Sequence, residues 1–349
     1  MVKSKTGILQ IFTGLNNTCR GSILPVLALL TFIFSWLGAY PSELVERWYA
    51  RIAYPEISWL AGRFADSVPF AWLDPTLIVG VVLLLLLIHK RRWMLLLNIA
   101  AVAYLMFFWC WGLNYHRPLL SSKLQLDSDR SDSSAIGDFT RHAASELNRL
   151  YSPMTAEPYE EDRMRTEAAE RVRRVVSIID GSNWTAAQRI KISELANPWM
   201  HAAGVDGVFN PLAHEPIITN TLLDVERPFI ISHELAHVRG YPDEGDANVI
   251  AVFATLMSGD PRFQYSGWMN LWLYLRNKDA DKLLEAGPRR DLQRIFDRAR
   301  SEEVRWINDF QRSLLDWFLK ANHVEQGVRS YSRVVLLAAE TEPVWERFR

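Results

Sequence analysis

The sequence predicts a mostly α-helical protein with a small β-sheet, in which three N-terminal transmembrane helices precede an α-rich domain. Long uncharged apolar stretches occur almost entirely before residue 117. Beyond that point apolar residues recur at three-and-four spacing in most segments, which is the pattern of amphipathic helices. The segment 207–223 instead combines β-branched residues with Pro and Asn and favours one or two short strands. The 349 residues are enough for one sizeable domain beside the membrane region.

The composition excludes several classes of protein. Thirty-nine Lys and Arg against 40 Asp and Glu give a net charge of −1, so the basic excess typical of nucleic-acid-binding proteins is absent. Hydrophobic residues make up 49% and charged residues 23% of the chain, which excludes a chain that is disordered throughout. The two cysteines, Cys19 and Cys110, are too few for a disulfide framework or a cysteine-rich zinc finger.

The membrane region is predicted to cover residues 21–117, with spans at about 22–42, 72–89 and 93–115. The first and third spans contain no charged side chain and are long enough, since about 20 apolar residues cross the hydrocarbon layer. The middle span is shorter because Asp74 and Lys90 bound its apolar core. A buried core helix is the alternative for that segment.

Basic residues set the predicted orientation. They precede the first span and fill the turn between the second and third spans: Lys3, Lys5, Arg20, Lys90, Arg91 and Arg92. Because Lys and Arg in short connections stay in the cytoplasm, residues 1–20 are predicted to be a cytoplasmic N-terminus and everything after Arg117 to be extracytoplasmic. A signal sequence is the alternative for the first span, although no small-x-small cleavage site occurs near Gly38 and Ala39.

Residues 118–134 are predicted to be a linker and residues 135–349 a single domain. The linker is rich in Ser and Asp, especially from Ser121 on, and has no apolar periodicity. Besides the strands within 207–223, the periodicity predicts helices at 135–150, 160–179, 185–196, 228–239, 243–258, 261–277, 288–321 and 324–339.

The strongest chemical signal is the pentapeptide His-Glu-Leu-Ala-His that begins at His233 and ends at His237. Histidines four residues apart project from one face of a helix, so both imidazoles can bind one zinc ion. Glu234 follows the first histidine, where a zinc hydrolase has its general base. Apolar neighbours predict a buried helix that ends at Gly240. The alternative is a pair of core or surface histidines that bind no metal.

A catalytic zinc ion has three protein ligands and one open position, so a third ligand is needed after the Gly240 turn. Glu244 is predicted, because it shares a helix face with small alanines that allow close packing against the histidine helix. Asp246 is rotated away and comes next, with Asp243 last. Asn248, one turn after Glu244, is predicted to hydrogen-bond a ligand. The alternative for Glu244 is an ordinary acidic residue in a first helical turn.

The segment HELAHVRGYPDEGDANVIA (233–251) resembles the signature of a bacterial membrane-protein family catalogued as domain of unknown function 3810. The resemblance extends to WGLNYHRP (111–118), Glu215, YLRN (274–277) and FLKANHVEQGVRSYSRVVLL (318–337). It implies a zincin-like, gluzincin-type metallopeptidase in the bacterial inner membrane. The family pattern is Glu-x-Glu-Ala-Asn, whereas this chain has Asp246 at the second acid. That departure leaves the prediction for Glu244 intact and weakens Asp246 as a ligand.

The expected activity is hydrolysis of peptide bonds by zinc-activated water, with Glu234 as the general base. The expected partners are Zn²⁺, a peptide or protein substrate and membrane lipid, and no nucleic acid. Tyr331 and Tyr241 are candidate donors to the oxyanion, with core packing as the alternative role. Asp246 and Glu215 are candidates to support the ligands, and Glu215 is equally a candidate surface carboxylate.

Two alternatives remain open from the sequence. The extended segment 215–223 is either an edge strand for a peptide substrate or a structural hairpin. A catalytically silent zinc-binding membrane sensor or scaffold is the alternative to an enzyme, and a zinc hydrolase of another amide is a third possibility, because the motif specifies the chemistry and not the substrate.

Overall fold

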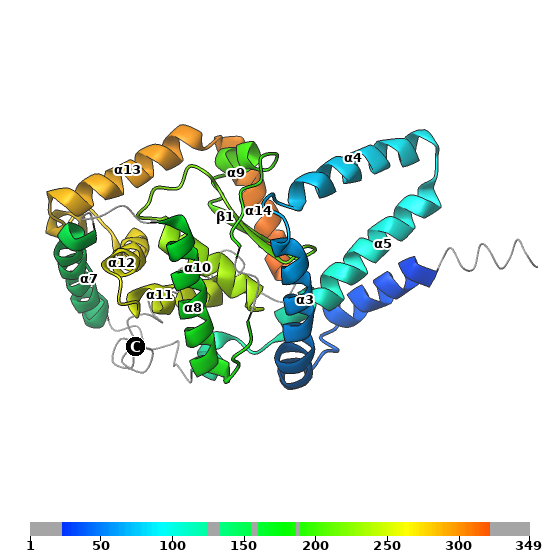
Figure 1. Ribbon diagram of the computed structural model, residues 1–349, viewed down its shortest axis with the longest axis horizontal. Helices are drawn as coiled ribbons and strands as arrows, with labels where there is room; N and C mark the ends of the chain where they lie inside the picture. Colours follow the sequence, from blue (N-terminus) through cyan, green and yellow to red (C-terminus); the bar gives the residue numbers. More distant parts are fainter. Residues whose placement is uncertain (1–22, 125–132, 155–159, 186–188, 322–349) are drawn as a thin grey trace, which may run out of the picture.

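The computed structural model describes residues 23–124, 133–154, 160–185 and 189–321. These residues are mostly helical and contain one two-stranded sheet (Figure 1). The prediction of a mostly helical protein with a small sheet is therefore confirmed. Figure 1 shows a lobe of long helices that projects from one side of a larger helical domain.

Three apolar helices form the projecting lobe: Ile23–Trp36, α4 (Leu73–His89) and α5 (Trp93–Cys110). Among the described helices, only α5 is both long and apolar enough to cross a membrane, and the other two are shorter. Most of their side chains face outward, since Leu87 is the one buried residue of α4 and Ala101 and Phe108 are those of α5. A helix that is apolar on all sides and not covered by protein is typical of a segment that faces lipid.

Short helices next to the lobe pack onto the domain. They are α2 (Ser42–Leu44), the π-helix η1 (Val45–Ala53), α3 (Tyr54–Asp66), the 3-10 helix η2 (Gly112–His116) and α6 (Leu120–Lys123). The structure differs here from the predicted linker, because Leu120 is fully buried within the main hydrophobic core. Leu124 also packs against this core, and the polar composition of the neighbouring residues concealed both apolar contacts.

The domain is built around α11 (Glu244–Leu256), in which every residue from Gly245 onward is buried. Its neighbours are α8 (Glu161–Asp180), α10 (Arg227–Val238) and α12 (Pro261–Leu275), and α7 (Ser133–Met154) packs on α12. The remaining helices are α9 (Asn197–Ala203), η3 (Ala280–Leu283), α13 (Ala286–Glu302) and α14 (Arg305–Ala321).

Some helix predictions differ from the structure. The described part of 185–196 is not helical, because Lys191 bridges to the sheet and its ammonium group pairs with the Glu215 carboxylate at 3.2 Å, both side chains being fully buried. The predicted helix 288–321 is two helices, since Glu303 has extended backbone with φ −68° and ψ 128°. Helix α9 was not predicted, and the predicted helix 324–339 lies outside the described residues.

The sheet is an antiparallel pair of β1 (Gly207–Asn210) and β2 (Glu215–Ile218). Lys191 occupies the other side of β2. Its amide donates to the Pro216 carbonyl at 3.0 Å, and its carbonyl accepts from the Ile218 amide at 2.9 Å. Within the described part of the chain, β1 therefore carries the unpaired edge of the sheet.

Candidate metal centre

The candidate metal ligands lie on α10 and at the start of α11, and a sharp turn at Gly240 joins these helices. Every residue from Ile231 to Val238 is buried. Gly240 has a φ of +78°, and a Cβ atom there would lie 2.8 Å from Asn114 Oδ1. Both the backbone conformation and the space therefore require glycine. Asp243 then caps α11 by accepting a hydrogen bond from the Asp246 amide.

Side chains from the segments beside the apolar lobe bind the last carbonyl groups of α10. The Tyr54 hydroxyl donates to the carbonyl of Val238 at 2.8 Å, and the Trp111 indole donates to that of His237 at 3.2 Å. The Arg117 guanidinium donates to the Gly240 carbonyl at 2.7 Å. Because the last carbonyls of a helix have no partner within it, these bonds hold the end of the helix that carries His237.

Three side chains bring their ligand atoms together at this turn. His233 Nε2 lies 3.1 Å from His237 Nε2 and 3.2 Å from Glu244 Oε2. His237 Nε2 lies 3.7 Å from the same carboxylate oxygen. All three ligand atoms fall within 4.8 Å of one another, so one ion can contact all of them. The structure thus brings together the three residues that the sequence singled out.

The outer nitrogen of each imidazole has its own partner. His233 Nδ1 lies 2.9 Å from Asn248 Oδ1, and His237 Nδ1 lies 2.7 Å from the Tyr241 carbonyl. Since both partners are oxygen acceptors, each Nδ1 carries the proton and each Nε2 presents a lone pair. This arrangement orients both rings as metal ligands require.

The charges of the cluster favour a cation. Burial alone would lower the pKa of His237, but the Glu244 carboxylate outweighs it and raises that pKa to about 9. Burial would raise the pKa of Glu244, yet His237 and His233 hold it well below its usual range. Two lone pairs and a carboxylate oxygen at these distances repel one another unless a proton or a metal ion lies among them.

Glu234 lies beside this cluster without joining it. The residue is buried, and its Oε2 atom has no hydrogen-bond partner among the described residues. Burial and the nearby Glu244 carboxylate raise the pKa of Glu234 to about 7, against the opposing effect of the two histidines. A Cβ atom at Gly207 would lie 2.3 Å from Glu234 Oε1, so β1 passes directly over the carboxyl group. An unpaired buried carboxyl group of near-neutral pKa suits a general base.

The cluster lines a cavity of about 760 Å³. His233, Glu234, His237 and Glu244 contribute to one wall, and the residues of β1 up to Phe209 contribute to another. The remaining walls come from α12, from α14, and from the end of α5 together with η2. The cavity is large enough for a segment of peptide beside the candidate ligands.

Two acidic residues predicted as ligand supports lie elsewhere. Asp246 accepts a hydrogen bond from the Leu120 amide at 2.8 Å and is directed toward α6. Glu215 is fully buried and accepts hydrogen bonds from the amides of Trp72 and Leu73 at 2.9 and 2.8 Å, besides its ion pair with Lys191. Neither of the predicted alternatives for Glu215 is therefore correct, because this carboxylate holds the start of α4 to the sheet.

Two tyrosines other than the predicted Tyr241 line the cavity among the described residues. The Tyr241 hydroxyl donates to Asp180 Oδ2 at 3.1 Å, and Tyr331 lies outside the described residues. Tyr274 of α12 and Tyr115 of η2 line the cavity instead. Burial and the Glu244 charge raise the pKa of Tyr274 to about 12. The segments YLRN and WGLNYHRP contain these tyrosines, but no spacing rule connects either segment with α10.

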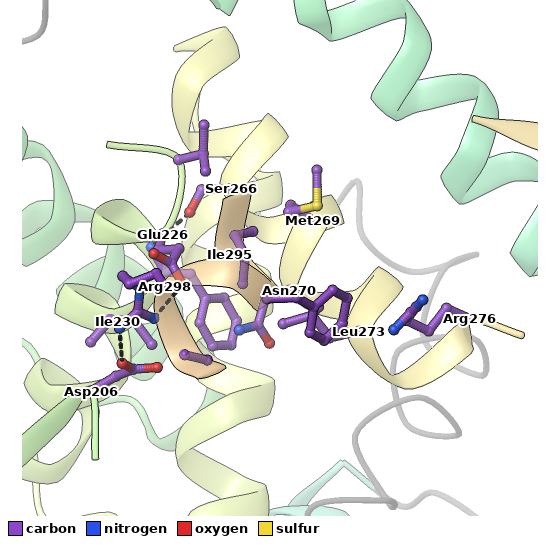
Figure 2. A pocket seen from close by; sticks show the side chains of 14 residues that line it. Asp206, Glu226, Ile230, Ser266, Met269, Asn270, Leu273, Arg276, Ile295 and Arg298 are labelled. Carbon is purple, nitrogen blue, oxygen red and sulfur yellow. Dashed lines mark hydrogen bonds and ion pairs between the residues drawn. The ribbon is translucent and has the colours of Figure 1, made fainter. Parts of the chain in front are cut away.

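A second cavity, of about 350 Å³, adjoins the first at the N-terminal part of α10 (Figure 2). Phe229 and Ile230 line both cavities. Figure 2 shows Arg298 of α13 between two acids, and it lies 2.6 Å from Glu226 and 2.9 Å from Asp206. The ion pair with Arg298 holds Asp206, which directly precedes β1, in position.

A buried group of charges ties the lobe side of the chain to the turn after α10. Glu46 of η1 pairs with Arg117 at 2.8 Å and with Lys123 at 3.0 Å. Arg117 also lies 3.3 Å from Asp180 Oδ2 and 4.5 Å from the centre of the Tyr241 ring. Burial would raise the pKa of Glu46, but Arg117 and Lys123 outweigh it and lower that pKa to about 2.

The comparisons with known proteins place the chain in one family. A family model described as "Protein of unknown function (DUF3810)" matches residues 49–339, which is well over half of the chain and includes α10 and α11. No curated protein and no solved structure matches the sequence.

Acid is expected to destabilise the protein through Glu46. Its pKa is lower in the folded state than the ordinary 4.5, so its contribution is present above about pH 4.5 and is lost as the pH falls toward about 2. Glu46→Gln is expected to lower the free energy of unfolding at pH 7 by about 2 kcal/mol and to flatten this acid limb. Thermal unfolding in detergent between pH 3 and 7 measures both effects. The exposed Glu43→Gln is the control, and an unchanged limb in Glu46→Gln would contradict the prediction.

Proposed function

We propose that this chain, which belongs to the DUF3810 family, is a membrane-anchored, zinc-dependent metallopeptidase that hydrolyses peptide bonds. The observation that carries the proposal is the convergence of His233, His237 and Glu244 on one point, with their ligand atoms within 4.8 Å of one another. The unpaired Glu234 carboxyl group beside them adds the general base. The open cavity in front of them provides room for a substrate.

The donor set suits zinc. Two imidazole nitrogens and one carboxylate oxygen are a common ligand set of catalytic zinc, and His233, His237 and Glu244 would supply it here. Asn248 and the Tyr241 carbonyl hold the histidine rings, as partners of ligand histidines do in zinc enzymes. When bound, a zinc ion supplies a water molecule of lowered pKa and polarises the substrate carbonyl.

The groups of the protein carry the proton and orient the substrate. Glu234 Oε2 accepts a proton from the attacking water and later delivers it to the leaving amine. Burial raises the pKa of this carboxyl group to about 7, so it can both accept and release a proton near neutral pH. Tyr274 lines the same cavity, and its hydroxyl is the proposed donor to the developing oxyanion.

The edge of β1 is the proposed platform for the substrate backbone. The segment 215–223 is less suitable, because β2 is paired with β1 on one side and with Lys191 on the other. The Thr219 amide donates to the Asp206 carbonyl at 2.9 Å. By alternation along the ladder, Gly207 and Phe209 then direct their backbone groups away from β2. An extended peptide can add to this edge beside Glu234.

We further propose that the lobe crosses the bacterial inner membrane three times, with the domain on the extracytoplasmic side. The apolar helices Ile23–Trp36, α4 and α5 expose most of their large side chains, which lipid would cover. The basic turn after α4, with Lys90, Arg91 and Arg92, favours the cytoplasmic side.

Metal analysis and one isosteric substitution test the enzymatic proposal. The purified protein is expected to contain about one zinc ion per chain, and the double variant His233→Ala/His237→Ala is expected to lose it, because two ligands are gone. Glu234→Gln is expected to keep the zinc and to lose hydrolysis of a mixed peptide pool by at least about 100-fold. His89→Ala, an exposed histidine of the lobe, is the control.

Two outcomes would count against the proposal. Zinc retention in the double histidine variant would show that the metal binds elsewhere. A cellular phenotype that survives Glu234→Gln while zinc is kept would favour a silent zinc-binding sensor or scaffold.

Gly207→Ala tests the position of the general base. The added methyl group would come within 2.3 Å of Glu234 Oε1, so the carboxyl group must shift from its present position. We expect a loss of hydrolysis of about tenfold or more, with zinc content and melting temperature close to those of the unmodified protein. Gly259→Ala, where an added Cβ atom meets nothing within 4 Å, is the matched control. Equal activity of both variants would contradict the assignment.

Paired reporter fusions test the topology. Alkaline phosphatase fused after residue 125 is expected to be active and a fluorescent protein fused there to be dark, because the former matures only outside the cytoplasm. Fusions after residue 91 are expected to give the reverse pattern, since the basic turn stays inside. The same pattern at both positions would contradict three spans.

A further inference from the structure

Helix α14 carries a stripe of large apolar side chains that no described residue covers. Trp306, Phe310, Leu314 and Trp317 are 71%, 64%, 52% and 65% exposed. At 100° per residue they fall within an arc of roughly 80° on one face of the helix. Buried aromatic residues are the rule for a folded domain, so a continuous uncovered stripe indicates a contact surface.

The ends of α14 are anchored where the hairpin of α4 and α5 meets the domain. At its C-terminal end, Phe318 lies 6.2 Å from Phe107 near the end of α5 and 5.9 Å from Tyr115, measured between ring centres. At its N-terminal end, the Asn308 side chain donates to the Ala203 carbonyl of α9 at 2.9 Å. In Figure 1, α14 runs from α9 toward α5 at the base of the projecting lobe.

Helix α9 lies in turn beside the start of α4. Met200 of α9 and Ala71, two residues before α4, belong to one buried cluster. Ser193, just before α9, donates a hydrogen bond to Asp74 in the first turn of α4. One end of α14 is therefore tied to the start of α4 and the other to the end of α5. Because both of these points lie at the same end of the hairpin, α14 runs across its base.

The opposite side of α14 belongs to the candidate catalytic cavity. Asn308, Gln311, Leu315 and Phe318 line that cavity and lie away from the exposed stripe. Phe107 and Tyr115 line the cavity as well. The cavity wall is thus shared by α14 and by the end of the lobe.

From this geometry we infer that α14 lies in the surface layer of the membrane, with its aromatic stripe in lipid, and that it places the catalytic cavity at the membrane surface. The favoured substrate class is then a peptide tethered to the membrane or the membrane-proximal segment of a membrane protein. This second part rests on the proposed peptidase function. The lipid contact does not.

The chemistry of the stripe fits this occupant. Tryptophan and phenylalanine are favoured at the boundary between headgroups and acyl chains, where amphipathic helices lie flat. Asp309, Ser313 and Lys320 lie along one border of the stripe and are exposed, so they would face the headgroups and water. Because α14 crosses the base of the proposed membrane hairpin, it has the depth and direction that a helix in the surface layer of the membrane needs.

Spin-label depth measurements on the full chain in phosphatidylcholine–phosphatidylglycerol vesicles test the lipid contact. Single labels replace Trp306, Phe310 or Trp317 in a Cys19→Ser/Cys110→Ser background, with labels at Asp309 and Ser313 as matched controls on the same helix. All these positions are exposed, so the labels disturb little packing. We expect labels on the stripe to collide more with oxygen than with a water-soluble nickel complex, and the controls to show the reverse.

Two results would overturn the inference. If the stripe and control labels are equally accessible to nickel, the face lies in water. If the stripe labels are shielded from both oxygen and nickel, protein covers the face, either residues 322–349 or a second copy of the chain. Labelled mixtures with dipolar distance measurement distinguish these two.

Cleavage of tethered and free peptides tests the substrate class. The full protein is reconstituted in vesicles and given one mixed peptide pool in two forms. In the free form the peptides are dissolved, and in the tethered form each peptide carries a palmitoyl chain. We expect the tethered pool to be cleaved about tenfold faster, because the vesicle surface concentrates it at the cavity. The double variant Phe310→Asp/Trp317→Asp, whose sites do not line the cavity, is expected to lose this advantage while it cleaves the free pool normally.

The two failures are distinguishable. Equal cleavage of both pools by the unmodified protein would overturn the substrate class while the peptidase function stands. Absence of zinc-dependent cleavage of either pool would overturn the peptidase function and the substrate class with it, and the depth measurement would still decide the position of α14.

Discussion

Three electron-rich atoms with room between them for one cation are the constraint on which this structure depends. His233 Nε2, His237 Nε2 and Glu244 Oε2 lie 3.1–3.7 Å apart, and at such distances they repel unless positive charge lies among them. Holding them there requires a helix, a reversal and a second helix in close contact. Gly240 makes the reversal possible because neither its φ nor its surroundings accept a side chain.

The lobe and the candidate metal centre form one structural unit. Tyr54, Trp111 and Arg117 donate hydrogen bonds to three carbonyls at the end of α10 and just beyond it. The ion pair of Arg117 with Asp180 and the hydrogen bonds from the Trp72 and Leu73 amides to the Glu215 carboxylate add two further connections between the two parts. The segments that flank the apolar helices therefore complete the capping of the helix that carries both histidines.

The same architecture explains how a substrate would reach the candidate ligands. One cavity wall is the edge of β1, another is the cluster of His233, His237 and Glu244, and a third joins α14 to the end of α5. In the proposed function, backbone recognition, bond cleavage and access from the membrane surface would fall to three different elements. Their meeting point is Glu234, which lies under Gly207 and beside the histidines.

The features that depend on the spacing of residues along a single helix were determined by the sequence itself. The spacing of His233 and His237 places both on one helix face, and the face shared by Glu244 and Asn248 follows from the same period. The apolar stretches of the lobe and most domain helices were predictable for the same reason. Tertiary structure alone decided the partners of Asp246 and Glu215 and the non-helical course around Lys191. It also decided that β1 is the free edge of the sheet and that Tyr274 and Tyr115 line the cavity. Each of these depends on contacts between separate segments of the chain or on a strand order, and local periodicity contains no information about which segments will meet.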